Sequence, residues 1–295
     1  MTRMKMSTLF LACLVAPLLI ALPGNARSQT YTFTSIDVPG AQDTFCDGIN
    51  DAGNVTGFYY NDFGYYDGFL LKDGNFTTLK YLNHSGDGTF LYGINDFNQL
   101  VGWETPRGGI TDGLEGSGDS VILIVEPDGS DTYVWDITNA AEIVGSYSDA
   151  SGSGVLYGFT DVGGIFTTVV VPHASSTEVH GINKQRQLVG IAYDQTLTQH
   201  GFQDDNGKFS VFDFPGAVWT EANRINDEGE IVGSYAATQF GPYSGYTKMG
   251  DVFTTVMYPG SADTEVLGLN NAGTIVGQYT DASGVIHGFM ATPQP

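Results

Sequence analysis

The sequence predicts an all-β protein, a six-bladed β-propeller with four antiparallel strands in each repeat of about 44 residues. A glycine preceded by apolar residues recurs six times, 43 to 45 residues apart. Short segments rich in β-branched and aromatic residues alternate with Gly, Pro, Asn and Asp turns. The recurring glycines are Gly57, Gly102, Gly145, Gly190, Gly233 and Gly277.

Three further positions keep a constant distance from these glycines. An asparagine lies seven residues before each glycine, except in the third unit, which has Thr138. A proline lies eighteen residues before, with His84 replacing it in the second unit. A threonine lies thirteen residues before every one of them. These threonines are Thr44, Thr89, Thr132, Thr177, Thr220 and Thr264.

Each unit is expected to contribute four strands in a fixed order. The first is the Phe-Thr-Thr-Val type at 33–38, 166–171 and 253–258, which a Pro-Gly pair ends in the clearest copies. The third unit departs most, with Val121-Ile122-Leu123 at this position. The second strand runs from the repeated threonine into a Gly-Ile-Asn sequence.

The remaining strands follow through tight turns. Asn50-Asp51-Ala52-Gly53 suits a hairpin, because Asn, Asp and Gly accept positive φ. The third strand is the Ile-Val-Gly-x-Tyr segment, as at 231–235. The Asp-Ala-Ser-Gly turn at 281–284 then leads into the fourth strand, which contains His287-Gly288-Phe289.

Six four-stranded units suit a closed ring better than a linear solenoid, which would need atypical capping repeats at its ends. We expect the ring to close by pairing residues 33–38 with a sheet built mostly from the C-terminal repeat. Residues 29–295 are predicted to form a single repeat domain. Its units are approximately 31–74, 75–118, 119–163, 164–207, 208–250 and 251–291.

Residues 1–28 are expected to be a signal peptide. Arg3 and Lys5 precede the apolar run 9–22, which is shorter than the roughly 20 residues that a membrane anchor needs. Cleavage is expected after Gly24-Asn25-Ala26 or after Ala26-Arg27-Ser28. The protein is therefore predicted to be secreted, to the extracellular space or the periplasm, without membrane association after cleavage and as a monomer.

The net charge disfavours two classes of partner, and the cysteine content excludes an intramolecular disulfide. Asp and Glu outnumber Lys and Arg by 33 to 11, for a net charge of −22, which disfavours nucleic acid and anionic membranes as partners. After removal of Cys13, Cys46 has no partner for an intramolecular disulfide. It aligns with apolar residues in the other units, so we expect a buried small hydrophobe.

The combined motifs resemble those of the bacterial extracellular repeat proteins of the HAF family. The resemblance rests on Ile-Asp-Val-Pro-Gly-Ala at 36–41, Gly-Ile-Asn-Asp-x-Gly, Ile-Val-Gly-x-Tyr and the His-Gly-Phe sequences at 200–202 and 287–289. It covers nearly all of residues 31–291 and implies secretion and a repeat architecture. It brings no activity or catalytic residues.

Most recurring residues are predicted to be architectural. The threonines are expected to tie each second strand to a neighbouring turn or blade. The tyrosines at the end of the third strand are expected to pack within blades. These are Tyr59, Tyr147, Tyr235 and Tyr279. His200 and His287 fall at a polar strand-edge position, without the short spacing of a metal site.

One column changes character around the ring. The residues directly after the repeated threonines are Phe45, Phe90, Tyr133, Glu178, Glu221 and Glu265. All six are expected at one height, near the end that carries the Pro-Gly loops. We predict that Glu178, Glu221 and Glu265, with Trp219 in an adjacent loop, bind a ligand. A solvated acidic rim with aromatics packed between blades is the alternative.

The favoured function is a non-catalytic binding module for an extracellular polysaccharide or protein. Oxygen-rich loops suit Ca²⁺, but no calcium-loop motif occurs, so no metal ligands are assigned. The chain also lacks a G-x-S-x-G nucleophile motif, and no catalytic residues are assigned. One alternative is a lyase or glycosidase using axial carboxylates, which requires a deep pocket and a carboxyl group of raised pKa. The other is a structural cell-surface or matrix protein.

Overall fold

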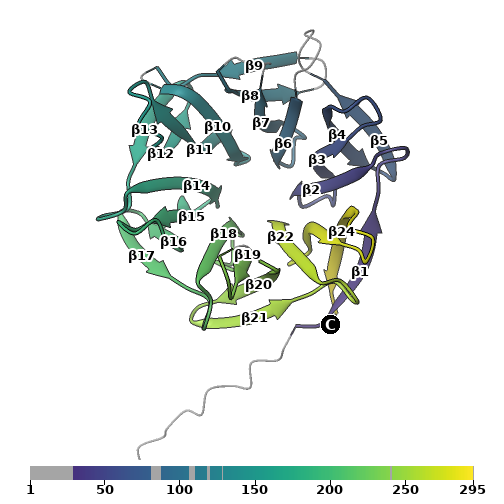
Figure 1. The fold of residues 1–295 in the computed structure, drawn as a ribbon. Helices are drawn as coiled ribbons and strands as arrows, with labels where there is room; N and C mark the ends of the chain where they lie inside the picture. The colour runs from purple at the N-terminus through teal and green to yellow at the C-terminus, as the bar shows by residue number, and fades with distance from the viewer. Residues whose placement is uncertain are drawn as a thin grey trace, which may run out of the picture.

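The computed structural model describes residues 29–80, 88–105, 110–117, 120–127, 129–239 and 241–294. These ranges form 24 strands in six four-stranded antiparallel sheets. The sheets stand around a common axis as the blades of a propeller (Figure 1). The predicted fold is confirmed. Residues 1–28, with both predicted cleavage sites, lie outside the described residues.

Each blade runs outward from an innermost strand beside the axis (Figure 1). The first two blades are β2 (Asp43–Ile49), β3 (Val55–Tyr60), β4 (Tyr66–Lys72), β5 (Asn75–Leu79) and β6 (Gly88–Ile94), β7 (Leu100–Thr105), β8 (Asp112–Ser117), β9 (Ser120–Ile124). The third and fourth are β10 (Gly129–Ile137), β11 (Glu142–Asp149), β12 (Leu156–Val162), β13 (Ile165–Val169) and β14 (Ser176–Ile182), β15 (Gln187–Tyr193), β16 (Gln199–Asp205), β17 (Lys208–Phe212). The fifth is β18 (Trp219–Ile225), β19 (Ile231–Ala236), β20 (Tyr243–Met249), β21 (Val252–Val256).

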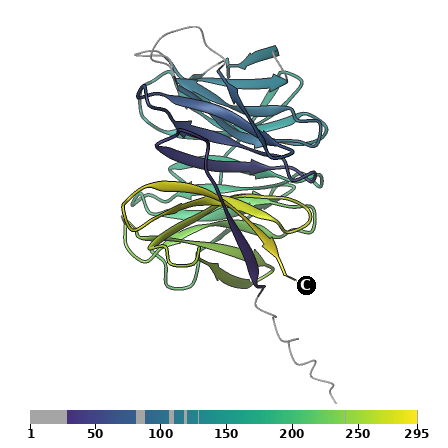
Figure 2. The ribbon, with the colours of Figure 1, turned by 90° about the vertical axis from the view of Figure 1, so that its right-hand side faces the viewer.

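The sixth blade closes the ring with both ends of the described chain. It contains β22 (Asp263–Leu269), β23 (Ile275–Thr280), β24 (Ile286–Pro293) and, outermost, β1 (Tyr31–Ile36). The β1–β24 register runs from Tyr31 opposite Pro293 to Ile36 opposite Gly288. Figure 2 shows β1 crossing beside the C-terminal strand. The predicted closure is confirmed, and the first strand of each repeat completes the preceding blade.

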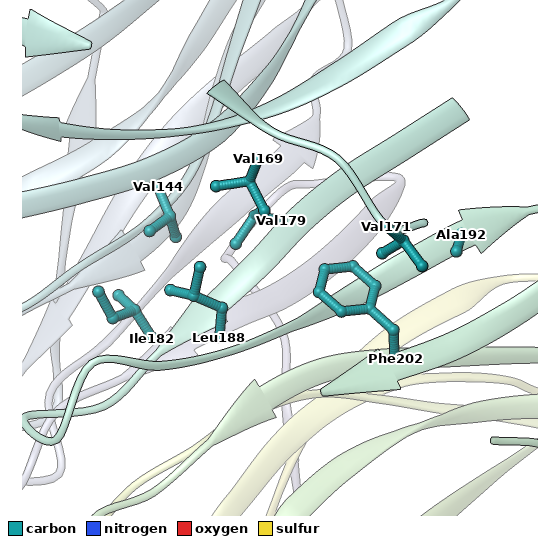
Figure 3. Packing of buried hydrophobic residues seen from close by; sticks show 8 residues of the cluster. All are labelled: Val144, Val169, Val171, Val179, Ile182, Leu188, Ala192 and Phe202. Atoms are coloured by element: carbon teal, nitrogen blue, oxygen red, sulfur yellow. The ribbon is translucent and has the colours of Figure 1, made fainter. Parts of the chain in front are cut away.

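Neighbouring blades bury apolar side chains between their faces. Between the third and fourth blades, Val144 and Val169 pack against Val179, Leu188 and Phe202 (Figure 3). Removing such surface from water stabilises by about 25 cal/mol per Å². Cys46 is fully buried at the equivalent position of the first blade, and burial raises the pKa of its thiol. Cys46 is therefore the small core residue that the alignment predicts.

The repeated threonines join adjacent blades, as predicted. Where the structure describes both residues, the hydroxyl accepts a hydrogen bond from a backbone N–H six residues earlier, at the end of the strand that completes the preceding blade. The five bonds in the described residues are Thr44 to Val38, Thr132 to Glu126, Thr177 to Val171, Thr220 to Phe214 and Thr264 to Tyr258, at 3.0 to 3.1 Å.

The third-strand tyrosines pack within blades, which confirms their architectural role. Tyr235 stacks on Phe214, and Tyr279 stacks on Tyr258, with ring centroids 3.6 Å apart in both pairs and each partner in the connection from the preceding blade. Each hydroxyl also contacts a hydroxyl on the outermost strand of its blade. These pairs are Tyr59–Thr78, Tyr147–Thr168, Tyr235–Thr255 and Tyr279–Ser35.

The six recurring glycines are required by an irregularity of the innermost strands. Every pairing between an innermost strand and the next contains a register shift, as in a β-bulge. The shift brings a backbone carbonyl of the inner strand against the glycine. A Cβ atom at Gly190 would lie 1.9 Å from the Glu178 carbonyl oxygen, and the other five positions are equally close.

We predict that Gly190→Ala lowers the free energy of unfolding by about 3 kcal/mol, because the methyl group overlaps a backbone carbonyl that cannot rotate away. Gly74→Ala is the control, since that turn glycine has a φ of 76° and open space around it. Its cost should be about 1 kcal/mol, from the left-handed backbone alone. Urea unfolding of both variants measures the difference, and equal costs would contradict the packing argument.

Candidate axial binding site

The β-bulges direct one unpaired residue of each innermost strand toward the axis. Together these residues surround a cavity of about 40 Å³, which we call the inner chamber. They are Asp47, Tyr92, Trp135, His180, Asn223 and Leu267, in order around the ring. Glu221 and Arg224 complete the lining.

Arg224 closes the chamber on one side. Its side chain is only 8% exposed, and its guanidinium group donates hydrogen bonds to backbone carbonyls of four different innermost strands. Its Nε also lies 3.8 Å from a carboxylate oxygen of Asp136. The four acceptors, at 2.7 to 2.8 Å, are the carbonyls of Tyr92, Trp135, His180 and Asn223.

Glycines at the equivalent positions make room for this guanidinium. The column contains Arg224 and Asp136 in two blades and glycine in the other four. A Cβ atom at Gly48 would lie 2.6 Å from the Tyr92 carbonyl oxygen, and one at Gly268 would lie 2.7 Å from that of Asp47. The innermost strands therefore approach each other closely, and their carbonyls converge on the axis.

On the far side of Arg224 lies a wider cavity of about 260 Å³, the turn-side funnel. The turns between the first two strands of each blade form its wall. Asn side chains link each blade to the next through bonds of 3.0 to 3.4 Å to a backbone carbonyl. The links run from Asn50 to Asn95, Asn95 to Thr138, Asn183 to Asn226, Asn226 to Asn270 and Asn270 to Asn50.

This circle is interrupted between the third and fourth blades, where Thr138 replaces asparagine. Two other contacts join the blades there. Arg186 pairs with Glu142 at 2.7 Å, and Asp136 accepts a hydrogen bond from the Ile182 N–H at 3.1 Å. The one irregular repeat is thus held by charged groups in place of an amide.

On the loop side of the chamber, the structure brings the predicted glutamates together. His180 lies between Glu178, at 3.7 Å from Nε2, and Glu221, at 3.5 Å from Nδ1. Glu265, on the next innermost strand, accepts a 2.7 Å hydrogen bond from Gln278. We call Glu178, Glu221 and Glu265, from three consecutive blades, the glutamate cluster.

Burial makes this cluster electrostatically unfavourable. It raises the pKa of Glu221, which His180 opposes and the charge of Glu178 reinforces. It raises the pKa of Glu265 to about 7, with the charges of Glu221 and Asp263 adding to the effect and the Gln278 hydrogen bond opposing it. Near neutral pH, Glu265 therefore carries a proton in a large fraction of molecules while it neighbours a second carboxyl group.

Aromatic rings occupy the same column in the opposite half of the ring. Phe45 stacks on Phe58 with centroids 4.6 Å apart, and Phe90 stacks on Trp103 at 4.3 Å. Phe58 meets Phe90 edge to face at 5.0 Å, so these rings pack between the first two blades, while Tyr92 lines the inner chamber 5.5 Å from Trp103. The column thus changes from aromatic residues packed between blades to the glutamate cluster.

Trp219 does not join the glutamates at the axis. It begins β18, is half-buried, and packs against Tyr243 with centroids 4.9 Å apart. Tyr243 in turn lies near Glu265, whose charge helps burial to raise the pKa of the tyrosine. Trp219 therefore stands behind the cluster and does not line the inner chamber.

Sequence reasoning missed Asp47, His180 and Arg224 as site residues. The repeat alignment contains a signal for them, since Asp47 and His180 lie two positions after the glutamate column and Arg224 lies three positions after it. Arg224 is also the one basic residue in a column that is otherwise glycine or Asp136. Without knowledge of the bulge, however, strict alternation does not predict which of these side chains faces the axis.

The histidines and loop aspartates that raised the question of metal binding serve local structure. His200 contacts Asp213 at 2.9 Å, and His287 contacts Asp37 at 2.6 Å, both at strand edges. Asp281 accepts hydrogen bonds from the backbone and hydroxyl of Ser283, as its turn chemistry predicts. Within the described ranges, no group of three or more His, Cys, Asp or Glu side chains is placed to hold a metal ion.

No family model matches the chain, and no curated protein matches it in sequence. Solved structures do match its fold. A variant of the Aleuria aurantia lectin in complex with Fucα1-6GlcNAc superposes with a TM-score of 0.52 at 11% identity, over 86% of this chain and 96% of the lectin. The same lectin with α-methyl-L-fucoside gives 0.50 at 11%, over 91% and 95%. A subtype N10 neuraminidase-like protein of A/little yellow-shouldered bat/Guatemala gives 0.52 at 9%, over 90% and 98%.

These likenesses establish a shared propeller architecture. They leave the site to be argued from its own residues. Among the described residues, no helix is long and apolar enough to cross a membrane.

We predict that Arg224→Lys destabilises the protein by about 3 kcal/mol, because one ammonium group cannot reach four buried carbonyls on separate strands. Arg186→Lys is the matched control, since the Arg186 side chain, which pairs with Glu142, is 59% exposed. That change should cost less than about 1 kcal/mol. Chemical denaturation measures both, and a small loss for Arg224→Lys would show that the guanidinium does not hold the axis.

We predict that stability falls as the pH rises from about 4.5 to 7. In this interval the unfolded Glu265 is ionised while the folded state keeps its proton. Glu265→Gln should flatten this part of the curve and stabilise the protein at pH 8 by up to about 3 kcal/mol. Thermal unfolding across the pH range tests this, with Glu228→Gln on an exposed turn as the unaffected control. A wild-type slope that persists in Glu265→Gln would refute the assignment.

Proposed function

We propose that the protein is a secreted, non-catalytic saccharide-binding module that takes its ligand at the loop-side mouth of the axis. The observation that carries the proposal is the column directly after the repeated threonines, which holds aromatic residues in three consecutive blades and the glutamate cluster in the other three. Aromatic rings offer flat apolar area for the C–H faces of a sugar. Carboxylates accept hydrogen bonds from its hydroxyl groups.

The surrounding tyrosines fit this chemistry. Tyr193 and Tyr243 both lie close enough to the glutamates for the carboxylate charges to help burial to raise their pKa values. The Tyr193 hydroxyl donates to Gln199 at 2.7 Å, which leaves its oxygen as an acceptor for a ligand hydroxyl.

The fold comparison supports the class of ligand. The Aleuria aurantia lectin, a propeller of comparable extent, is described in complex with fucosides. At 11% identity the likeness gives no reason to transfer a particular sugar or its binding position. Secretion is supported by the N-terminal sequence alone, and membership of the HAF family by the motif resemblance alone.

The proposal predicts that the double variant Glu178→Gln, Glu265→Gln binds saccharide at least about tenfold more weakly, since amides replace two carboxyl groups that hydrogen-bond the ligand hydroxyls. A panel of immobilised neutral, acidic and amino oligosaccharides would identify the ligand. Calorimetry would then measure its affinity for the wild type and for the double variant. The control pair Glu228→Gln, Asp62→Asn neutralises exposed acids and should leave affinity unchanged. Equal affinity of the wild type and the glutamate variant would refute the proposed site, and no binding across the panel would refute the proposed function.

A polysaccharide-cleaving enzyme is the second candidate. Glu265, with its pKa of about 7 beside Glu221, resembles the acid and base pair that glycosidic bond cleavage uses. Arg224 separates the turn-side funnel from the inner chamber, which argues against a long substrate that passes through the axis. Mass spectrometry of the same oligosaccharides after incubation decides, because cleavage products that disappear in Glu265→Gln would establish catalysis.

A further inference from the structure

The inner chamber contains buried carboxylate oxygen that the protein leaves without a partner. Asp47 is only 4% exposed, and its Oδ2 atom accepts no hydrogen bond. His180 is equally buried, and its Nε2 atom makes no hydrogen bond, with Glu178 standing 3.7 Å away. Burying a polar atom without a partner costs free energy, so such atoms often mark a missing ligand.

The charge of the chamber is also unbalanced. Asp47 and Glu221 line it, and Arg224 is the one basic residue among the lining groups, His180 apart. Arg224 already directs its guanidinium N–H groups to four carbonyls and lies beside Asp136. Its four terminal N–H donors are therefore used, and its Nε lies toward Asp136.

Aromatic faces complete the lining. Tyr92 and Trp135 meet edge to face with centroids 4.6 Å apart, and His180 lies 4.5 Å from Trp135 on the other side. These rings contact one another, so they bound the chamber as an apolar wall. Carboxylates on either side of two aromatic rings form a cage that favours positive charge.

The size of the chamber restricts the shape of the ligand. A volume of about 40 Å³ exceeds the roughly 10 to 15 Å³ that one water molecule needs, but it is too small for a sugar ring. A slender group with N–H donors fits these limits. Entry from the loop side passes Glu221, which precedes Asn223 and Arg224 on the same strand.

We propose that the inner chamber is a binding site for a primary alkylammonium group, held by Asp47 and Glu221 beside Tyr92 and Trp135. The ammonium donates one hydrogen bond to Asp47 Oδ2 and another to Glu221, while its methylene chain extends toward the loop-side mouth. A lysine side chain and a polyamine carry the same group. The site shares Glu221 with the glutamate cluster but includes Asp47, which the saccharide proposal does not use, so the two proposals are tested independently.

Calorimetry of the full chain with n-butylammonium, at fixed ionic strength against sodium, tests the proposal. We expect saturable binding at one site, at least about tenfold weaker in Asp47→Asn and in Glu221→Gln. Asp51→Asn, which neutralises an acid at the rim of the turn-side funnel, is the matched control and should bind normally. Tetramethylammonium, which lacks N–H donors and is wider, should bind at least about tenfold more weakly.

Two further titrants distinguish the two sources of the ammonium group. Spermidine represents polyamines, and Nα-acetyl-lysine amide represents a protein side chain. Quenching of tryptophan fluorescence by n-butylammonium in the wild type provides a readout that does not depend on the variants folding. Absence of saturable binding and of quenching would show that the chamber holds only water. Binding that Asp47→Asn and Glu221→Gln leave intact would place the cation elsewhere on this acidic protein. Either result overturns the proposal, whatever the saccharide panel shows.

Discussion

The whole structure depends on the closure of the ring. A four-stranded blade exposes two apolar faces and can bury them only against neighbours, so the last blade must meet the first. Pairing of β1 with β24 achieves this without a covalent link. The Thr-to-backbone bonds and the circle of asparagine amides then repeat the connection at the two ends of the blades. Each addition limits how far one blade can tilt from the next.

Closure has a consequence at the axis, where six strands converge. The bulge in each innermost strand turns a carbonyl toward a glycine and aims one side chain inward. Carbonyls that converge this closely need a donor, and Arg224 supplies it for four strands at once. The same guanidinium divides the axis into the turn-side funnel and the inner chamber. Structural stability and the shape of the candidate site therefore depend on the same residue.

The buried carboxyl groups in the loop-side half of the axis lower the stability of the protein, and the fold does not require them. Burial raises the pKa values of Asp47, Glu221 and Glu265, and apolar residues at these positions would pack without that penalty. Phe45 and Phe90 fill the glutamate column in other blades, which shows that the repeat accepts apolar side chains there. Local conflicts with stability of this kind are expected at functional sites. The saccharide and ammonium proposals both assign a ligand to this concentrated negative charge.

The sequence by itself determined the periodic features: six units, four strands in each, the Pro-Gly and Asn-Asp turns, the pairing of the two ends, and the shared height of Glu178, Glu221 and Glu265. These follow from local patterns repeated at a constant interval. Only the tertiary structure decided that Asp47 and His180 face the axis, because a bulge breaks the alternation from which side-chain direction is predicted. It also decided that Arg224 reaches Tyr92, 132 positions away, and that Trp219 turns toward Tyr243. Contacts across the axis join residues that no local pattern relates, so they exist only once the ring has closed.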